Sequence, residues 1–256
     1  MKLQTCKAAL LGAGLALCMA SAHAANGVSF QAGIERVSFG VIDLTPQDGV
    51  AASYSSSLLA SSYRGRIDTR YSDRKFEDST SGQGPVTHAL DVGPLHAAAT
   101  AGGGIGEISI EGFAAPLDGY SGIAEAFAWQ RYAVTLGAGS ALTVTGYAYL
   151  DLAYSGNGVT TKNTNGSASV YVGDEWQDMS TLTILSGTAP GYSEAENLWL
   201  SLANSGTDDM TIWVEFRVSA QSLVSALPVP EPATYAMLGL GLLTIGAVAR
   251  RRATRA

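Results

Sequence analysis

The sequence predicts an all-β domain between residues 25 and 228, built as a single antiparallel β-sandwich or jelly roll, with one helix at each end of the chain. Apolar and polar residues alternate with a period of two over several long runs. Helical periodicity is scarce in the same region. Thirty glycines, many of them between apolar runs, suit turns and bulges.

The N-terminal segment has the features of a secretory signal peptide. Lys2 and Lys7 are followed by an almost wholly apolar run from residue 8 to 20, and Ala22 and Ala24 provide small residues at the −3 and −1 positions. We therefore expect residues 1–24 to form the signal helix and cleavage to follow Ala24. An uncleaved anchor is the alternative. Both cysteines lie inside this segment, so the rest of the chain can form no disulfide or thiolate metal site.

The first half of the domain gives the weaker strand signals. Val28 and Phe30 indicate a first strand, and residues 34–41 a second one. Residues 46–85 are rich in serine and charge, and we expect one edge strand there, in which Tyr63, Ile67 and Tyr71 alternate with arginines and Asp68. Residues 51–60 and 97–101 could form short helical turns. Ile108 and Ile110 indicate a further strand.

The second half alternates more clearly. Residues 142–152 form a long strand, which follows a strand ending at Leu136 and a turn over residues 137–140. Residues 198–203 and 210–220 form two more strands. The polar segment 204–209 between them predicts a hairpin. In that hairpin Trp199 and Trp213 face each other if the register allows it.

Net charge argues against nucleic acid as a partner. Of the 15 basic residues, two lie in the signal segment and four at positions 250–255, which leaves nine in the domain against 21 acidic residues. A balance near −12 repels nucleic acid and anionic membranes. It is also the ordinary state of an exported soluble protein.

The domain contains no recognised catalytic motif, so we predict no catalytic residues, no cofactor and no metal site, and expect the protein not to be an enzyme. His88 and His96 could form a metal pair or provide one catalytic base, but no ligand spacing supports a site, and histidines without a task are favoured. Basic residues between positions 64 and 75 could bind an anionic polysaccharide. A solvated edge strand is the favoured alternative. These residues are Arg64, Arg66, Arg70, Arg74 and Lys75.

Calcium and sugar ligands are further alternatives. Acidic residues in two expected loops could donate oxygens to Ca²⁺, although neither loop matches a known calcium motif. They are Asp174, Glu175 and Asp178 in one loop and Asp208 and Asp209 in the other. Exposed aromatic residues could stack on sugar rings, and Tyr147 with Tyr149, or Trp199 with Trp213, are the candidates. Ordinary cross-strand pairing is the favoured alternative for them.

The C-terminal tail, residues 229–256, carries the most specific signal. Val229, Pro230, Glu231 and Pro232 precede seventeen uncharged residues, 233–249, and the cluster Arg250, Arg251 and Arg252 follows. Seventeen helical residues reach about 25 Å, the short end of a transmembrane helix. Arginines are costly to translocate, so we expect residues 250–256 in the cytoplasm and the domain outside, in agreement with the signal peptide.

A Pro-Glu-Pro motif, a short Gly/Leu/Ala helix and an arginine cluster at the C-terminus resemble the PEP-CTERM sorting signal. The resemblance implies that an exosortase, a membrane-embedded cysteine protease, recognises the motif and removes the tail. It also implies transfer to the cell surface or extracellular matrix of a Gram-negative bacterium that makes extracellular polysaccharide. An ordinary single-pass anchor is the alternative.

These expectations leave three function classes. The preferred one is a non-enzymatic surface or matrix protein that associates with extracellular polysaccharide in biofilm. The second is a carbohydrate- or calcium-binding β-sandwich module. The third is an extracellular polysaccharide hydrolase, which requires two carboxylates at a set separation across a cleft.

Overall fold

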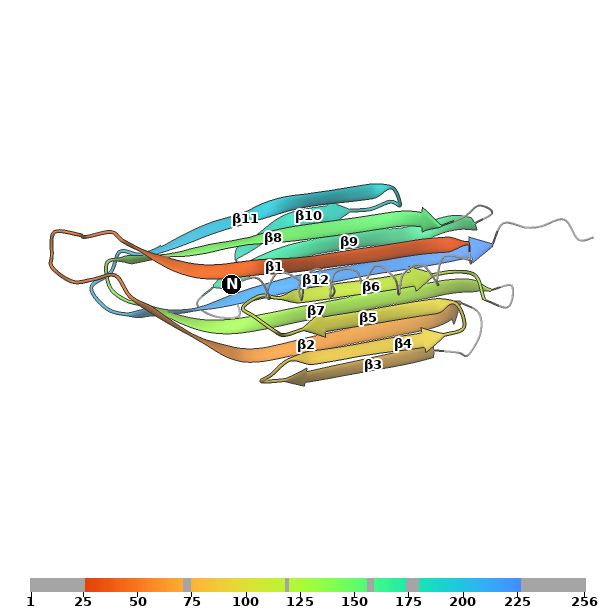
Figure 1. Cartoon of the computed structure of the whole chain (residues 1–256), viewed down its shortest axis with the longest axis horizontal. Helices are drawn as coiled ribbons and strands as arrows, with labels where there is room; N and C mark the ends of the chain where they lie inside the picture. The colour runs from red at the N-terminus through yellow and green to blue at the C-terminus, as the bar shows by residue number, and fades with distance from the viewer. Residues whose placement is uncertain (1–25, 71–74, 118–119, 156–158, 174–179, 227–256) are drawn as a thin grey trace, which may run out of the picture.

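The fold of the domain is known from a computed structural model, which describes residues 26–70, 75–117, 120–155, 159–173 and 180–226. Every regular element in these ranges is a β-strand, and the twelve strands form two six-stranded antiparallel sheets (Figure 1). The predicted all-β class is confirmed. The predicted signal peptide and sorting tail, with their two helices, lie outside the described residues.

The two sheets are mixed in chain order. Sheet 1 contains, from edge to edge, β11 (Tyr192–Asn204), β8 (Ser140–Ser155), β1 (Gly27–Asp43), β6 (Ile108–Ala114), β5 (Leu95–Ala101) and β4 (Val86–Val92). Sheet 2 contains β10 (Ser180–Gly187), β9 (Val159–Gly173), β12 (Met210–Ala226), β7 (Ser121–Leu136), β2 (Tyr54–Arg70) and β3 (Lys75–Gly82).

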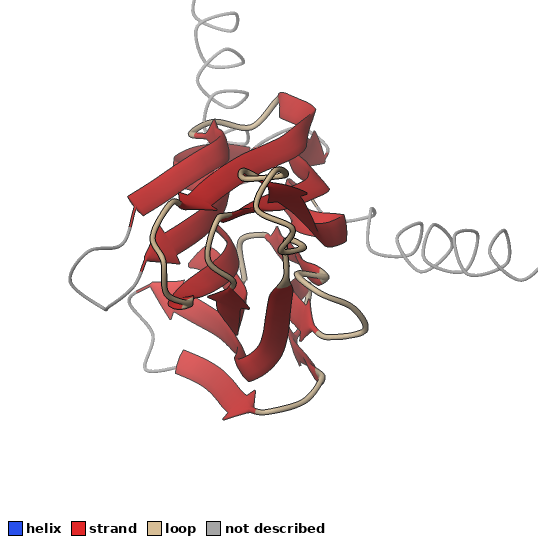
Figure 2. Cartoon of the chain, turned by 90° about the vertical axis from the view of Figure 1, so that its left-hand side faces the viewer, coloured by secondary structure: helices blue, strands red, loops and turns tan. Residues whose placement is uncertain are grey.

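The core lies between the inner faces of the two sheets, which the end view in Figure 2 shows as separate layers. Phe30 and Leu150 enter it from sheet 1, and Phe216 and Val134 from sheet 2, all of them buried. The alternation that predicted the strands at 142–152 and 210–220 is confirmed, because the apolar positions of β8 and β12 are the inward ones.

The prediction of two short strands at the start of the domain was wrong, because β1 is one strand of 17 residues. A β-bulge interrupts its pairing with β8 between Glu35 and Ser38, so that two residues of β1, Arg36 and Val37, oppose Gly146 alone. The bulge shifts the alternation by one residue, and this shift made one strand look like two.

The prediction of short helical turns at 51–60 and 97–101 was also wrong, since residues 54–60 lie in β2 and residues 97–101 lie in β5. Their inward positions carry small residues, such as Ala97, Ala99 and Gly65, which give little hydrophobic contrast. β2 is not an edge strand either: it pairs with β7 over its whole length, and β3 forms the edge beyond it.

The predicted hairpin around residues 204–209 does not exist. β11 belongs to sheet 1, where it pairs with β8, and β12 belongs to sheet 2, where it pairs with β7 and β9. The loop is a crossing between the sheets. Asn204 fixes it, since its amide donates to the carbonyl oxygens of Leu136, Gly137 and Asp208 at 3.1, 3.1 and 2.9 Å.

The two ends of the described domain lie together. Gly27 pairs with Ser155 and Ala226 pairs with Val159, so the chain enters and leaves at one end, which we call the tail end. The far end carries the loops at 44–53, 137–139 and 205–209 (Figure 1). Leu44 donates its N–H to Gly139 O at 2.9 Å, and Gly137 donates to Ser53 O at 3.0 Å, so the first two loops are tied together.

No helix in the described part of the chain is long and apolar enough to cross a membrane. The segment predicted to do so, residues 233–249, lies beyond that part.

Candidate functional site

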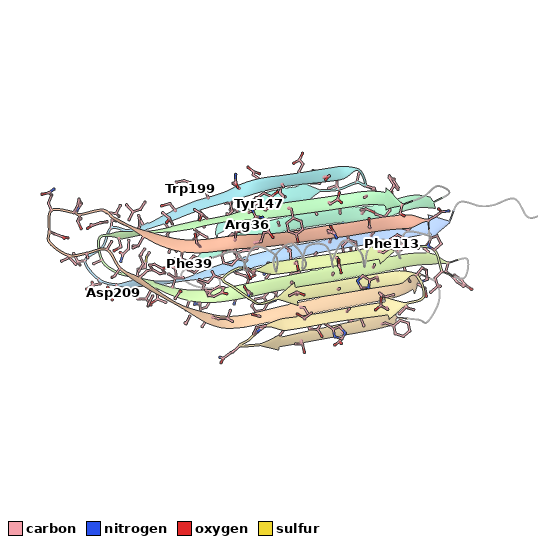
Figure 3. The ribbon with its side chains drawn as sticks, viewed as in Figure 1. Arg36, Phe39, Phe113, Tyr147, Trp199 and Asp209 are labelled. Atoms are coloured by element: carbon pink, nitrogen blue, oxygen red, sulfur yellow. The ribbon has the colours of Figure 1, made fainter. Side chains whose placement is uncertain are left out.

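An exposed aromatic surface lies on the outer face of sheet 1, across β11, β8 and β1. We call it the platform, and it consists of Trp199 and Asn197 from β11, Tyr147 and Tyr149 from β8, and Arg36 from β1. Figure 3 shows Trp199, Tyr147 and Arg36 on these three neighbouring strands.

Strand register places these side chains together. Trp199 pairs with Thr145, Asn197 pairs with Tyr147, and Tyr147 is opposite Glu35 on its other side. Diagonal neighbours on one face of a sheet lie about 7–8 Å apart, so Trp199 and Tyr147 are near neighbours on this face. Asn197 and Glu35 flank it with polar groups.

The bulge in β1 brings Arg36 to the platform. Arg36 has a φ of 54°, and it is the only described non-glycine residue with a positive φ. A non-glycine residue in this region costs about 1–2 kcal/mol, and such strain often marks a functional position. The Arg36 guanidinium lies 5.5 Å from the centre of the Tyr147 ring and 3.2 Å from the Glu35 carboxylate.

The ring of Tyr149 lies over the backbone of β1 at Gly33. A Cβ atom on the opposing Gly33 would lie 2.5 Å from the Tyr149 ring, so only glycine allows the ring to cover the backbone there. Burial raises the pKa of Tyr149, and the carboxylates of Glu35 and Glu111 raise it further. The phenol therefore stays protonated and can donate a hydrogen bond.

Trp199 is the most exposed large apolar side chain among the described residues, at 67%. Within that part of the chain no aromatic ring or guanidinium covers the indole. An indole face with polar neighbours can stack on the apolar face of a sugar ring, while amide, carboxylate and phenol groups bind its hydroxyls. The prediction that Trp199 faces Trp213 was wrong, because the two residues lie on different sheets.

A second aromatic group lies on the outer face of sheet 2, and the sequence interpretation missed it. Glu215 in β12 points to this outer face, yet its side chain is 0% exposed. It accepts hydrogen bonds from the Nε atoms of Arg131 at 2.8 Å and Arg217 at 2.9 Å, and from the Nη2 atoms of both.

Each of these arginines is sandwiched by aromatic rings. Arg131 lies 5.3 Å from the ring centre of Trp129 and 5.6 Å from that of Trp213. Arg217 lies 5.5 Å from Phe127 and 4.4 Å from Tyr171. We call these seven residues the arginine–aromatic cluster. Each of its four rings already has a guanidinium group as a neighbour, whereas no such contact is made by the Trp199 indole among the described residues.

The proposed basic patch is largely neutralised. Arg64 pairs with Glu77 at 2.9 Å and Lys75 pairs with the same carboxylate at 2.7 Å. Arg66 pairs with Asp68 at 2.6 Å. Arg74 and Tyr71 lie outside the described residues, as does the side chain of Arg70. The described bases belong to a charged strand pair at the edge of sheet 2, in agreement with the favoured alternative of a solvated edge.

The two histidines cannot form a metal pair. His88 contacts Asp78 at 2.7 Å and stacks on Tyr63 with ring centres 5.0 Å apart, which ties the edges of the two sheets together. His96 lies in β5 on the outer face of sheet 1, between Asp91 at 2.7 Å and Glu111 at 3.8 Å.

The carboxylates around His96 set its charge. Glu111 and then Asp91 raise the pKa of His96, although partial burial acts against them, and His96 in turn lowers the pKa of Glu111. His96 therefore keeps its proton to a higher pH than an unperturbed histidine, next to two carboxylates.

Among the described residues, no group of three or more histidine, cysteine, aspartate or glutamate side chains is arranged to hold a metal ion. In the calcium candidate at the far end, Asp208 and Asp209 are both exposed, and only the Asp208 backbone serves the loop. The other candidate loop, with Asp174, Glu175 and Asp178, lies in the undescribed segment 174–179.

Comparison with protein families matches residues 228–252 to the PEP-CTERM protein-sorting motif. The matched range includes the Pro-Glu-Pro motif at 230–232 and the arginines at 250–252. Comparison with curated proteins finds no match.

The all-β domain with a C-terminal sorting signal defines an exported protein that is sorted to the cell surface. The chain carries a PEP-CTERM sorting motif at residues 228–252, and this motif implies processing by an exosortase.

Proposed function

We propose that this protein is a non-enzymatic component of the cell surface or extracellular matrix that binds extracellular polysaccharide through the platform. The observation that supports it most is Trp199, an indole left 67% exposed beside Tyr147 in a protein with a surface-sorting motif. A flat indole beside polar side chains suits the apolar face of a sugar ring, and neutral sugar rings suit the acidic domain better than anionic ligands do.

The sorting route completes the proposal. Residues 1–24 direct export and are removed after Ala24, residues 233–249 hold the chain in the inner membrane, and Arg250–Arg252 stay in the cytoplasm. The exosortase then cuts at the motif Val229–Pro232. The product is released to the surface or matrix, where the platform meets the polysaccharide.

Binding is tested by calorimetry of the protein with extracellular polysaccharide from a biofilm-forming Gram-negative host. We expect Trp199→Ala to weaken binding about tenfold, since an aromatic contact near 1.4 kcal/mol corresponds to that factor. Val50→Ala is the matched control, because Val50 is 64% exposed at the far end, away from the platform. Equal binding by wild type and Trp199→Ala would reject the platform as the binding surface.

The two remaining parts are tested separately. Release of reducing ends from the polysaccharide during incubation would overturn the non-enzymatic assignment. In an exosortase-producing host we expect a shortened protein in the surface or medium fraction, and its C-terminus is read by mass spectrometry. A full-length protein that stays in the membrane of that host would contradict the sorting route.

A further inference from the structure

We propose that the tail end of the sandwich is a lipid-contacting surface, which rests on the outer leaflet of the membrane that holds residues 233–249 before the tail is removed. Three exposed aromatic side chains, Phe76, Tyr120 and Tyr154, form the contact. This inference rests on the sorting route proposed above and does not depend on the binding of polysaccharide.

The exposed apolar side chains of the described domain are divided by type between its ends. Those at the far end are mainly aliphatic and belong to the β1–β2 loop and the strands beside it, where Ile42, Leu44 and Val50 are exposed. Those at the tail end are all aromatic: Phe76 is 43% exposed, Tyr120 is 45% exposed and Tyr154 is 54% exposed. The aromatic group therefore coincides with the end at which the chain leaves the fold.

Strand register places Tyr154 and Tyr120 close to the end of β12, where the chain leaves the fold. Tyr154 contacts Thr161 through its hydroxyl at 3.3 Å, and Thr161 pairs with Val224, two residues before the end of β12. Tyr120 directly precedes β7, whose second residue, Gly122, also pairs with Val224.

Phe76 lies slightly further from the end, on the edge strand of sheet 2. It pairs with Ile67, which is level through Ala124 with Ser222 of β12. Four residues of strand span about 13 Å, so Phe76, although it is three strands from β12, lies at the same end of the sandwich as Tyr120, Tyr154 and the exit point at Ala226.

Chain length keeps this end near the bilayer. Seven peptide units separate Ala226 from residue 233, the start of the apolar segment. Seven residues reach at most about 25 Å, and prolines at 228, 230 and 232 restrict the path further. β12 alone is about 55 Å long at 17 residues, so the far end cannot approach the bilayer while the domain stands on its tail end.

Lipid suits these side chains better than a second copy of the chain does. Tyrosine combines an apolar ring with a wet hydroxyl, and aromatic residues concentrate at membrane–water interfaces for this reason. A second copy would have to approach through the space next to a membrane-bound tail. Cleavage of the tail detaches the domain from the membrane, so the aromatic side chains contact lipid only in the uncut protein.

The experiment uses residues 25–256, the chain expected after removal of the signal segment, which contains no cysteine because both lie in residues 1–24. Single cysteines are introduced as Tyr120→Cys, Tyr154→Cys or Val50→Cys and carry an environment-sensitive fluorophore. The protein is reconstituted in phosphatidylethanolamine–phosphatidylcholine vesicles, which have no net charge to repel the acidic domain, and these vesicles contain lipid with a spin label near the headgroup. Resistance to carbonate extraction reports insertion of the tail.

We expect the spin-labelled lipid to quench the fluorophores at 120 and 154 at least twofold more than the one at 50. A retained protein with equal or absent quenching at these positions would overturn the lipid contact and leave the sorting route intact. A protein that is extracted by carbonate would overturn both. A fluorophore at 154 that is shielded from water without being quenched would show self-association instead, and would also overturn the proposal.

Discussion

Removal of the Glu215 carboxylate tests the physical account of the arginine–aromatic cluster. Glu215 is fully buried and is bonded to two guanidinium groups, and the Arg131 side chain is only 8% exposed. Glu215→Ala leaves Arg131 as a buried cation without its counter-charge, a loss that costs about 3–5 kcal/mol. For a domain of this size that free energy lowers the melting temperature by about 6–20 °C.

Three companion variants assign this cost. Arg217→Ala removes a partner that is 36% exposed, so we expect a loss of about 1 kcal/mol. Arg131→Leu alone leaves the Glu215 carboxylate with one exposed partner and should be strongly destabilising. The double variant Arg131→Leu, Glu215→Leu removes both charges and should be more stable than either single variant, since apolar replacement of a buried ion pair is often close to neutral.

Urea unfolding measured by far-UV circular dichroism gives these free energies, and it avoids the tryptophan signal, which comes partly from the cluster itself. A loss below about 1 kcal/mol for Glu215→Ala would refute the reasoning, because a buried, bonded carboxylate cannot be removed so cheaply. Double-variant losses equal to the sum of the single losses would refute the coupling of Arg131 and Glu215.

The remaining predictions concern three other positions. The pKa of His96 is raised in the fold, so the stabilisation that its charge gives is full below the unfolded pKa of about 6.5 and is lost as pH rises through the higher folded pKa. We therefore expect His96→Gln to lower the urea midpoint at about pH 5.5 and to leave it unchanged at about pH 9. A loss of the same size at both pH values would contradict this reasoning. In Gly122→Ala the new Cβ overlaps the Ala115 carbonyl oxygen, so we expect a loss of about 1–3 kcal/mol, whereas Gly82→Ala meets open space and should change stability by less than about 0.5 kcal/mol; similar thermal melts for both would count against the packing argument. Arg36→Gly should be more stable than Arg36→Ala by about 1 kcal/mol, because only glycine relieves the φ of 54°, and the reverse order would exclude strain at the bulge.

The strands that could be predicted from the sequence are those with large apolar residues at every second position. β8 and β12 present Leu, Val, Ile and Phe inward, so the period of two is visible without any partner. In β2 and β5 many of the inward positions are small or polar, and Ser61 and Ala97 become buried only because neighbouring strands cover them. This burial cannot be predicted from the residues of the strand itself.

Pairing across the loop at 204–209 could not be predicted either. A polar loop of this length suits a hairpin and a crossing between sheets equally well, and the choice is made by β8 and β7, which lie far away in the sequence. The same choice separated Trp199 from Trp213. The sequence therefore identified an aromatic residue of the candidate site but assigned it the wrong neighbour.

Arg36 and Glu215 show two different limits. No residue type near Arg36 indicates a bulge, since its position depends on the register of β1 against β8. The buried position of Glu215 could have been predicted from the sequence. Trp213, Glu215 and Arg217 occupy every second position of β12, and Trp129 and Arg131 occupy every second position of β7. Two strands with tryptophan and charge on the same face could have predicted a covered ion pair.

The position of β12 has a consequence for the order of events during export. This strand lies between β7 and β9 in the middle of sheet 2, but it comes from residues 210–226, later in the chain than the other eleven described strands. Until those residues have crossed the membrane, β7 and β9 each have an unpaired edge, and sheet 2 lacks the strand that joins its two halves. Residue 228, where the matched sorting motif begins, follows only two positions later. The last strand of the fold and the sorting motif therefore cross the membrane almost at the same time.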